Sequence, residues 1–299
     1  MLYKIPFTIK KYIDENISYP VGIIGCRATN PEMSFECCEY DLAIFSEQKY
    51  GNKILKLGNY KAELINLPLT CTQNNSLDLK GMIFLKGNDS FILSSIGKTL
   101  DPEHYLKVLK VSGKKRIINS LFYYEAIKKN IEKQSLMASM WLKICAYDFL
   151  GGILALSGSK PMPLHELNQI RHMNINRQDI ADGVRIALEC IGLERATKSI
   201  ILRSLEAVSE LISKEHDKEL TLIKIKHLID NDMFSDCYYY LGKIGQRILT
   251  SKPEHFCSDY IKLIQISLDL ANDTAQTENL HSQLVKISKN ILRQINSPF

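Results

Sequence analysis

The sequence has little that would mark a secreted or membrane-spanning protein. Its 299 residues include eight cysteines, but no two of them form a Cys-x-x-Cys pair, and their spacing fits no standard zinc site. No window reaches the roughly 18 apolar residues of a membrane span, and the start has no apolar core long enough for a signal peptide. Thiols in such a chain are expected to be reduced, so we expect a cytoplasmic protein without a membrane partner.

Neither the modest net charge nor any common motif indicates a particular function. The net charge of +5 comes from 38 basic and 33 acidic residues, so it permits an anionic ligand without requiring nucleic acid. The chain contains no Gly-x(4)-Gly-Lys-Ser/Thr, no Gly-x-Ser-x-Gly and no His-Glu-x-x-His. Any catalytic site must therefore be sought in less common patterns.

Short apolar runs separated by turn residues fill the first hundred residues and predict strands. Two of these runs flank Gly58-Asn59 and predict a hairpin that turns there. Ahead of the runs, Ile9, Tyr12 and Ile13 share one helical face, so a short helix should precede the sheet. The predicted strands are residues 21–25, 41–45, 53–57, 61–67, 81–85 and 90–96.

After Asp101-Pro102 the apolar spacing changes to the i, i+3, i+4 pattern of long helices. The expected fold class is α+β, with a small mixed-sheet domain followed by an all-helical C-terminal half. A glycine pair, Gly151-Gly152, interrupts one helix, and since each glycine costs about 1 kcal/mol there, we expect close packing or a kink. The predicted domains are residues 1–100, 101–215 and 216–299.

An acidic pair stands directly before the second apolar run. Glu39 and Asp41 alternate along a strand while Tyr40 faces the other way, so both carboxylates share one face. Such oxygens suit Mg²⁺ or Mn²⁺, although a solvated strand edge would look the same. Gly25 ends the preceding strand, and a glycine turn lets backbone N–H groups approach an anion.

These residues carry a family resemblance. The stretch "IIGCRATNPEMSFECCEYDLAIF" resembles the signature of the DNA polymerase beta-like nucleotidyltransferase superfamily, in particular its minimal and aminoglycoside-type members. That signature is an apolar strand, Gly-Ser-Arg-Ala, a loop, and Asp-x-Asp followed by apolar residues. Gly25, Arg27 and Ala28 match its first part, and Asp41 matches its second. The family's third carboxylate comes from a later strand beside the first, where Glu63 is the candidate; a cross-strand salt bridge explains Glu63 equally well.

The resemblance implies transfer of an NMP group from a nucleoside triphosphate to an acceptor hydroxyl, with Mg²⁺ or Mn²⁺. Asp41 and Glu63 would be catalytic, and Glu39 would join them in holding the metal. The acceptor is open among a small molecule, a protein and RNA, and a homodimer is left open. The competing interpretation is a catalytically inactive binding protein that keeps the nucleotidyltransferase fold.

The phosphate-binding part departs from the family at one of its positions. Gly25, Cys26 and Arg27 would cradle the nucleotide phosphates, but the family has serine where this chain has Cys26, and a thiol is a poorer donor. The first family aspartate is likewise replaced by Glu39, which is one methylene longer. Arg27 could equally be an ordinary surface arginine.

The helical half adds a weaker resemblance over residues 142–171. The pattern is similar to the helical domain of aminoglycoside-type nucleotidyltransferases, which closes over the nucleotide and helps to hold the acceptor. Lys143 and Tyr147, at i and i+4, would point towards phosphate or base. In the alternative the helix packs through its apolar residues and Lys143 is in solvent. The basic run 114–116 is expected in a loop that faces phosphate, RNA or only solvent.

Overall fold

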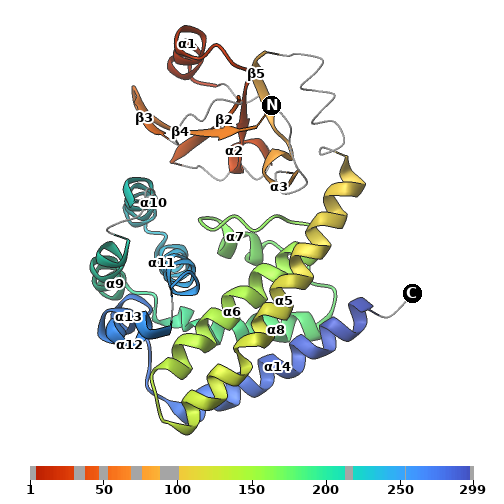
Figure 1. Ribbon diagram of the computed structural model, residues 1–299, viewed down its shortest axis with the longest axis vertical. Coiled ribbons are helices and arrows are strands. Elements are labelled where there is room, and N and C mark those ends of the chain that lie inside the picture. The colour runs from red at the N-terminus through yellow and green to blue at the C-terminus, as the bar shows by residue number, and fades with distance from the viewer. Residues whose placement is uncertain are drawn as a thin grey trace. The chain divides into compact units, whose positions relative to one another are not determined.

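The computed structural model describes residues 5–29, 38–46, 53–68, 76–87, 101–212, 218–252 and 254–296 (Figure 1). The chain divides into two compact units, residues 1–109 and 110–299. The first holds a five-stranded mixed sheet and the second is helical, so the fold class is α+β as predicted. The domain boundaries predicted at 100 and 215 stay predictions.

The sheet has the strand order β3-β4-β2-β1-β5. β2 pairs with β1 in antiparallel and with β4 in parallel orientation, so β2 is the central strand and both of its edges are paired. β3 and β4 form the predicted hairpin, in which Gly58 takes a positive φ of 64°. The strands are β1 (Val21–Ile24), β2 (Glu39–Phe45), β3 (Lys53–Leu57), β4 (Tyr60–Leu67) and β5 (Ile83–Lys86).

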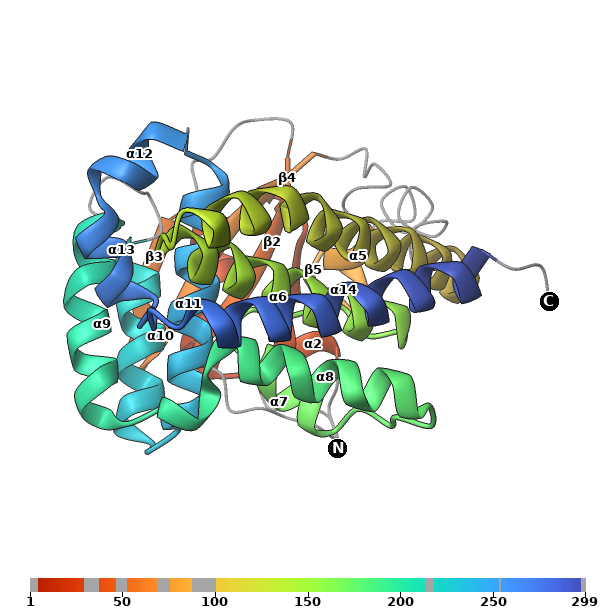
Figure 2. The ribbon, with the colours of Figure 1, turned by 90° about the horizontal axis from the view of Figure 1, so that it is seen from below.

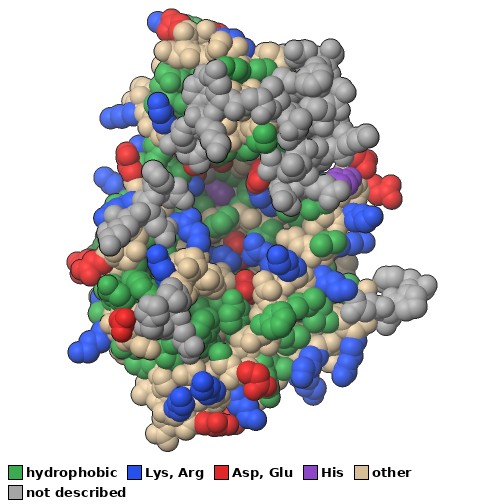
Figure 3. Space-filling view, in the orientation of Figure 1, with side chains coloured by type: hydrophobic (Ala, Val, Ile, Leu, Met, Phe, Trp, Pro, Cys, Tyr) green, Lys and Arg blue, Asp and Glu red, His purple; other side chains and the backbone are tan. Residues whose placement is uncertain are grey.

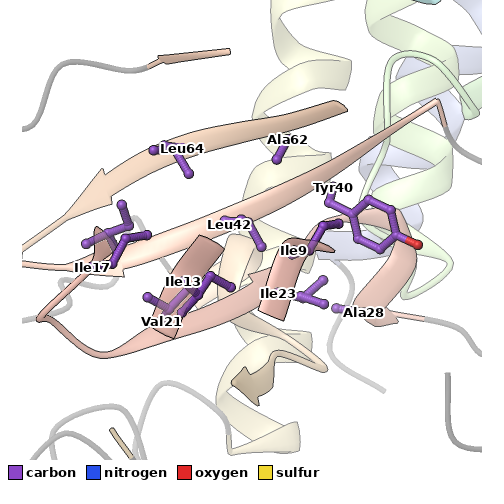
Figure 4. Close-up of a cluster of buried hydrophobic side chains, with 11 residues drawn as sticks. Ile9, Ile13, Ile17, Val21, Ile23, Ala28, Tyr40, Leu42, Ala62 and Leu64 are labelled. Atoms are coloured by element: carbon purple, nitrogen blue, oxygen red, sulfur yellow. The ribbon is translucent and has the colours of Figure 1, made fainter. Parts of the chain in front are cut away.

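Helix α1 (Phe7–Asn16) covers one face of this sheet, as its apolar spacing predicts. Ile9 and Ile13 are fully buried against the even-numbered side chains of β2, among them Leu42 (Figure 4). Tyr40 belongs to the same cluster and is 5% exposed. Because successive side chains of a strand alternate, Tyr40 on this face places Glu39 and Asp41 on the other.

The second face of the sheet is apolar at one end and acidic at the other. Ala43 and Phe45 of β2 pack there with Ile24 and with Leu79, which comes from the short helix α3 (Ser76–Leu79). The odd-numbered positions that precede them on β2 are the two carboxylates. The acidic pair therefore continues an apolar face of the sheet.

Within the described residues of this unit, the helix and strands predicted from the sequence agree with the structure in type and position. The pairing of β1 with β2 was expected, and so was the hairpin at Gly58-Asn59. The predicted strand at 90–96 lies outside the described residues.

The helical unit contains no strand among the residues described from Pro102 to Asn296, in agreement with the prediction. Its first helix starts with a capping contact, in which the His104 N–H donates to Asp101 Oδ2 at 3.0 Å and Pro102 occupies the first turn. The helices are α5 (Pro102–Glu132), α6 (Met137–Leu156), α7 (Glu166–Arg171), α8 (Gln178–Ile191), the 3₁₀ turn η2 (Leu193–Arg195), α9 (Lys198–Leu211), α10 (Lys218–Asp230), α11 (Phe234–Thr250), α12 (Glu254–Asp259), α13 (Ile261–Ser267) and α14 (Thr274–Asn296).

The prediction of a loop at the basic run 114–116 is wrong. These residues lie inside α5, which is a continuous helix of 31 residues. Gly113, which suggested a turn, is instead a packing position: a Cβ there would lie 2.8 Å from the Gly152 carbonyl oxygen of α6. The glycines thus let α5 and α6 approach closely, which confirms the close packing expected at Gly151-Gly152.

Helix α6 is the central helix of this unit. Figure 2 shows α5, α6, α8 and α14 side by side, and α6, α8 and α14 contact one another. By length and composition α6 could cross a membrane, with a mean hydropathy of 1.3, but 78% of its apolar window is buried inside the protein. Its apolar character is explained by that burial, since a helix that is hydrophobic all round must be covered on all sides.

Candidate functional site

Three adjacent strands bring Gly25, Asp41 and Glu63, three of the predicted site residues, into one row. Asp41 on the central strand β2 lies opposite Ile24 of β1 and opposite Glu63 of β4. Residues opposite each other on neighbouring strands point to the same face and are about 5 Å apart. Because Gly25 follows Ile24 directly, the row runs from the Gly25 turn through Asp41 to Glu63.

Gly25 and the Asp41 carboxylate are in close approach. Gly25 has a φ of 74°, in the left-handed region that glycine adopts without strain. A Cβ added there would overlap Asp41 Oδ2 and lie 3.2 Å from Asp41 Cγ. The position therefore requires glycine twice, for its backbone angle and for the room that the carboxylate occupies.

Arg27 holds the start of β2. Its Nε donates to the backbone carbonyl of Glu39 at 2.7 Å, and its guanidinium lies 4.1 Å from the centre of the Tyr40 ring. A charge-assisted hydrogen bond and a cation–π contact together fix the strand that carries both carboxylates. Arg27, which the resemblance implies as a phosphate ligand, is half-buried and contacts the two residues that precede Asp41 on β2.

The two acidic residues of β2 differ in their surroundings. Glu39 is only 3% exposed, and the Cys38 thiol donates to Glu39 Oε2 at 2.6 Å. Asp41 and Glu63 are half-buried. No group of three His, Cys, Asp or Glu side chains within the described residues is placed to hold a metal ion together. Asp41 and Glu63, directly opposite each other on β2 and β4, are the half-buried carboxylates of this row.

Lys143 lies in the interior of the helical unit. It is 4% exposed, and its ammonium donates to the Tyr238 hydroxyl at 3.1 Å and to the carbonyls of Leu268 and Asp269 at 2.7 and 3.2 Å. Those carbonyls lie at the C-terminal end of α13, where a cation is stabilised by the helix dipole. Burial, and then the Arg195 guanidinium, lower the pKa of Lys143 to about 7.

The structure accordingly gives Lys143 neither of the two surroundings considered from the sequence. It is not in solvent, and its three N–H donors are engaged inside the bundle. Tyr147, four residues later, is also buried, with its hydroxyl against Gly242 of α11.

A buried polar cluster in the helical unit was missed by sequence reasoning. Glu166 of α7 is 1% exposed, accepts a hydrogen bond from the Tyr239 hydroxyl at 2.8 Å and lies 3.3 Å from the Lys243 ammonium. Beside it, Gln246 donates to Asp148 at 2.8 Å. Burial raises the pKa of Asp148, against the opposing effect of Lys243 and of Arg116.

In the polar cluster, Tyr239, Lys243 and Gln246 follow one another at i, i+4 and i+7 on α11, but their partners Glu166 and Asp148 come from α7 and α6, and no spacing rule joins those helices to α11. The signal that could have drawn attention to the cluster is Gly151. A Cβ at that position would lie 2.6 Å from Arg116 Nη1 and 3.4 Å from Glu166 Oε1, so the glycine makes room for polar side chains.

The chain matches no protein-family model and no curated protein sequence. Function must therefore be argued from the residues and their geometry.

Proposed function

We propose that this protein is a nucleotidyltransferase that moves an NMP group from a nucleoside triphosphate to an acceptor hydroxyl. The observation that carries the proposal is the row of Gly25, Asp41 and Glu63 across three adjacent strands. A glycine turn that admits an anion beside two carboxylates is an arrangement suited to phosphoryl chemistry.

The arrangement also supports the resemblance to the DNA polymerase beta-like superfamily. In that family the third carboxylate comes from a later strand beside the strand that carries the acidic pair. Glu63 has this relation to Asp41, since β4 is the parallel neighbour of β2 and the two residues are directly opposite. A register shifted by one residue would have turned Glu63 to the opposite face.

The proposed reaction forms a bond between the acceptor oxygen and the α-phosphorus, and it breaks the bond from that phosphorus to the β-phosphate bridge oxygen. Pyrophosphate leaves with the electron pair of the broken bond. Glu63 accepts the proton of the acceptor hydroxyl, directly or through water, because it is half-buried and lies beside the reacting centre held by Asp41. The absence of a side chain at Gly25 leaves the room that the Asp41 carboxylate occupies, and it keeps the backbone of the turn open to a phosphate.

Two residues of this site, Asp41 and Glu63, are suited to bind a divalent metal ion. The carboxylates of Asp41 and Glu63 are hard oxygen ligands on one face of the sheet, and they would hold Mg²⁺ or Mn²⁺ together with substrate phosphates and water. When bound, such an ion neutralises charge that develops on the phosphates. Glu39 fits less well, because its carboxylate is buried and is bonded by the Cys38 thiol.

The burial of Glu39 and its hydrogen bond from the Cys38 thiol favour a second candidate function, that of a catalytically inactive protein that keeps the fold and binds nucleotide. A carboxylate committed to an internal hydrogen bond contributes no ligand unless its side chain changes rotamer. The two candidates share their fold and differ in whether Asp41 and Glu63 suffice for transfer.

The test is incorporation of label from each α-³²P-labelled nucleoside triphosphate in the presence of Mn²⁺ or Mg²⁺. The full-length chain is incubated with small hydroxylated acceptors, cell extract and itself as acceptor. Asp41→Asn should lower transfer at least about a thousandfold while the fold persists, since it removes charge at a phosphoryl-transfer centre. Absence of transfer in the wild type, with a higher melting temperature for Asp41→Asn, decides for the inactive protein.

A further inference from the structure

The helical unit carries the net positive charge of the chain, because basic and acidic residues balance within the first 109 positions. Part of this charge is concentrated on α14. From Asn279 to Asn296 that helix contains Lys286, Lys289 and Arg293 but no Asp or Glu. In Figure 3, Lys and Arg side chains stand along the right-hand side of the helical unit, over α5 and α14.

The three cations share one face of α14, at spacings of three and four residues. All three are exposed, and together they line a concavity of about 320 Å³ between α14 and α5. Tyr124 is the α5 residue that lines it, and the remaining lining residues are uncharged or apolar side chains of α14. A concavity with three cations and no carboxylate in its lining attracts an anion of several charges.

Tyr124 gives this concavity an aromatic wall. Its ring is half-buried and packs against the His281 ring, tilted by 32° with 4.7 Å between the ring centres, and the Lys289 ammonium lies 5.7 Å from the Tyr124 ring centre. His281 is 4% exposed, and burial lowers its pKa to about 4, so at neutral pH it backs Tyr124 as an uncharged ring.

From this combination we propose that the α5–α14 concavity binds single-stranded nucleic acid, with its phosphates on Lys286, Lys289 and Arg293 and a base against Tyr124. Single-strand binding sites in general combine a basic groove with an aromatic ring on which an unpaired base stacks. The inference uses residues separate from the acidic row of the first unit and does not depend on nucleotidyl transfer.

A lipid surface is less suited to this face. A helix that lies in a membrane interface presents apolar side chains beside its basic ones. On α14 the apolar residues Leu280, Leu284 and Ile291 are buried inside the protein, on the side away from the exposed cations. The basic face therefore offers charge and one aromatic ring, which are the contacts that a nucleic acid strand uses.

The test is fluorescence anisotropy of a labelled oligouridylate of about 12 nucleotides, within the site sizes of known single-strand binders. The full-length wild type should bind it, and the logarithm of affinity should fall with the logarithm of salt with a slope of about −2 for three phosphate contacts. The Lys286→Gln/Lys289→Gln/Arg293→Gln variant should bind at least tenfold more weakly, with a slope near zero. Glutamine keeps the helix propensity of lysine and arginine, and equal melting temperatures confirm the fold.

A matched control removes the same charge elsewhere. Lys198, Lys226 and Lys262 are exposed on α9, α10 and α13, and the triple change of these residues to glutamine should leave affinity within twofold. Tyr124→Leu should lower affinity at least fivefold without changing the salt slope, because stacking is lost while the charges stay.

Three results would overturn the proposal. The first is no binding by the wild type at low salt. The second is equal loss in the two triple variants, which would show that only bulk charge matters. The third is loss of binding to anionic phospholipid vesicles in the α14 variant when oligonucleotide binding is unaffected, which would assign the face to a membrane.

Discussion

The carboxylate of Asp41 occupies the space where a side chain at Gly25 would stand. Gly25→Ala should therefore have two effects: strain at a φ of 74°, of about 1 kcal/mol, and displacement of the carboxylate. We expect the variant to lose the rise in melting temperature that Mn²⁺ with ATP gives the wild type. A ligand that binds one site of the folded protein at a hundredfold excess over Kd stabilises that protein by about 2.7 kcal/mol. Differential scanning fluorimetry with and without ligand measures this.

Gly58→Ala is the matched control for this prediction. Gly58 has a similar φ of 64°, but a Cβ there would meet only Thr8, at 3.6 Å or more. It should show comparable backbone strain and keep the ligand-induced shift. If both alanine variants keep the shift, the Gly25 turn has no part in binding.

Lys61 lies two residues before Glu63 on β4 and is the lysine of the salt-bridge alternative, so changing each residue in turn distinguishes a catalytic role of Glu63 from a structural one. If Glu63 acts as base beside Asp41, Glu63→Gln should lower nucleotidyl transfer about a hundredfold or more, while Lys61→Gln leaves it unchanged. Stability of Glu63→Gln should be equal or higher, because repulsion from Asp41 is relieved. If the two glutamine variants instead destabilise the protein equally and leave transfer alone, Glu63 belongs to a salt bridge.

Cys26 tests whether the departure from the family serine limits the reaction. Cys26→Ser restores a hydroxyl donor at the half-buried position that follows Gly25, so transfer should rise or stay unchanged. Cys26→Ala removes the donor and should lower transfer below the wild-type rate. Rates in the order alanine, cysteine, serine, from lowest to highest, would assign Cys26 a donor role; equal rates in all three would remove it from the site.

The sequence predicted the first unit well because its signals are local. Alternation around Tyr40 assigned Glu39 and Asp41 to one face, and positive-φ glycines marked both the hairpin and the strand end. It could not predict the difference between the two carboxylates. That difference depends on the Cys38 thiol and on burial, which are properties of the folded chain.

In the helical unit the same reasoning reached the helices but not their polar interior. Lys143 reads as a surface residue by type, since lysine is rarely buried, yet the C-terminal carbonyls of α13 and Tyr238 surround it. These partners are 95 or more residues away in the chain, so no spacing rule could have found them. Gly113 looked like a loop because the helix–helix contact that requires it involves Gly152, on another helix.

Glu166 and Lys243 form a buried ion pair whose disruption should be costly. Lys243→Met leaves the Glu166 carboxylate, at 1% exposure, without its cation, and we expect a loss of about 3–5 kcal/mol in the free energy of unfolding. The double variant Lys243→Met/Glu166→Gln should recover most of this loss. Arg185→Met, which breaks an exposed pair with Glu189, should cost less than about 0.5 kcal/mol in the same urea titration. A Lys243→Met cost as small as that of Arg185→Met would contradict the importance of the buried pair.

Lys143 should make stability depend on pH in a defined window. Burial lowers its pKa from the ordinary value of 10.5 to about 7, so between these values the unfolded chain binds a proton that the folded chain does not. A rise in pH disfavours the state that binds more protons, which here is the unfolded chain. The free energy of unfolding therefore increases, by up to about 1.4 kcal/mol per pH unit. Below pH 7 both states are protonated and the dependence disappears.

Buried thiols set the upper limit of this window. Burial raises the pKa of Cys145 and Cys237 to about 12, so above about pH 8.5 the unfolded chain loses thiol protons that the folded chain keeps, and stability falls. We therefore expect the wild type to gain about 1.5 kcal/mol between pH 7 and pH 8.5 from Lys143. Lys143→Met lacks the titrating group and should lack this gain, and urea titrations of both proteins at intervals of about half a pH unit measure the difference. Parallel curves for wild type and variant would show that Lys143 stays protonated in the folded bundle, stabilised by its three hydrogen-bond acceptors.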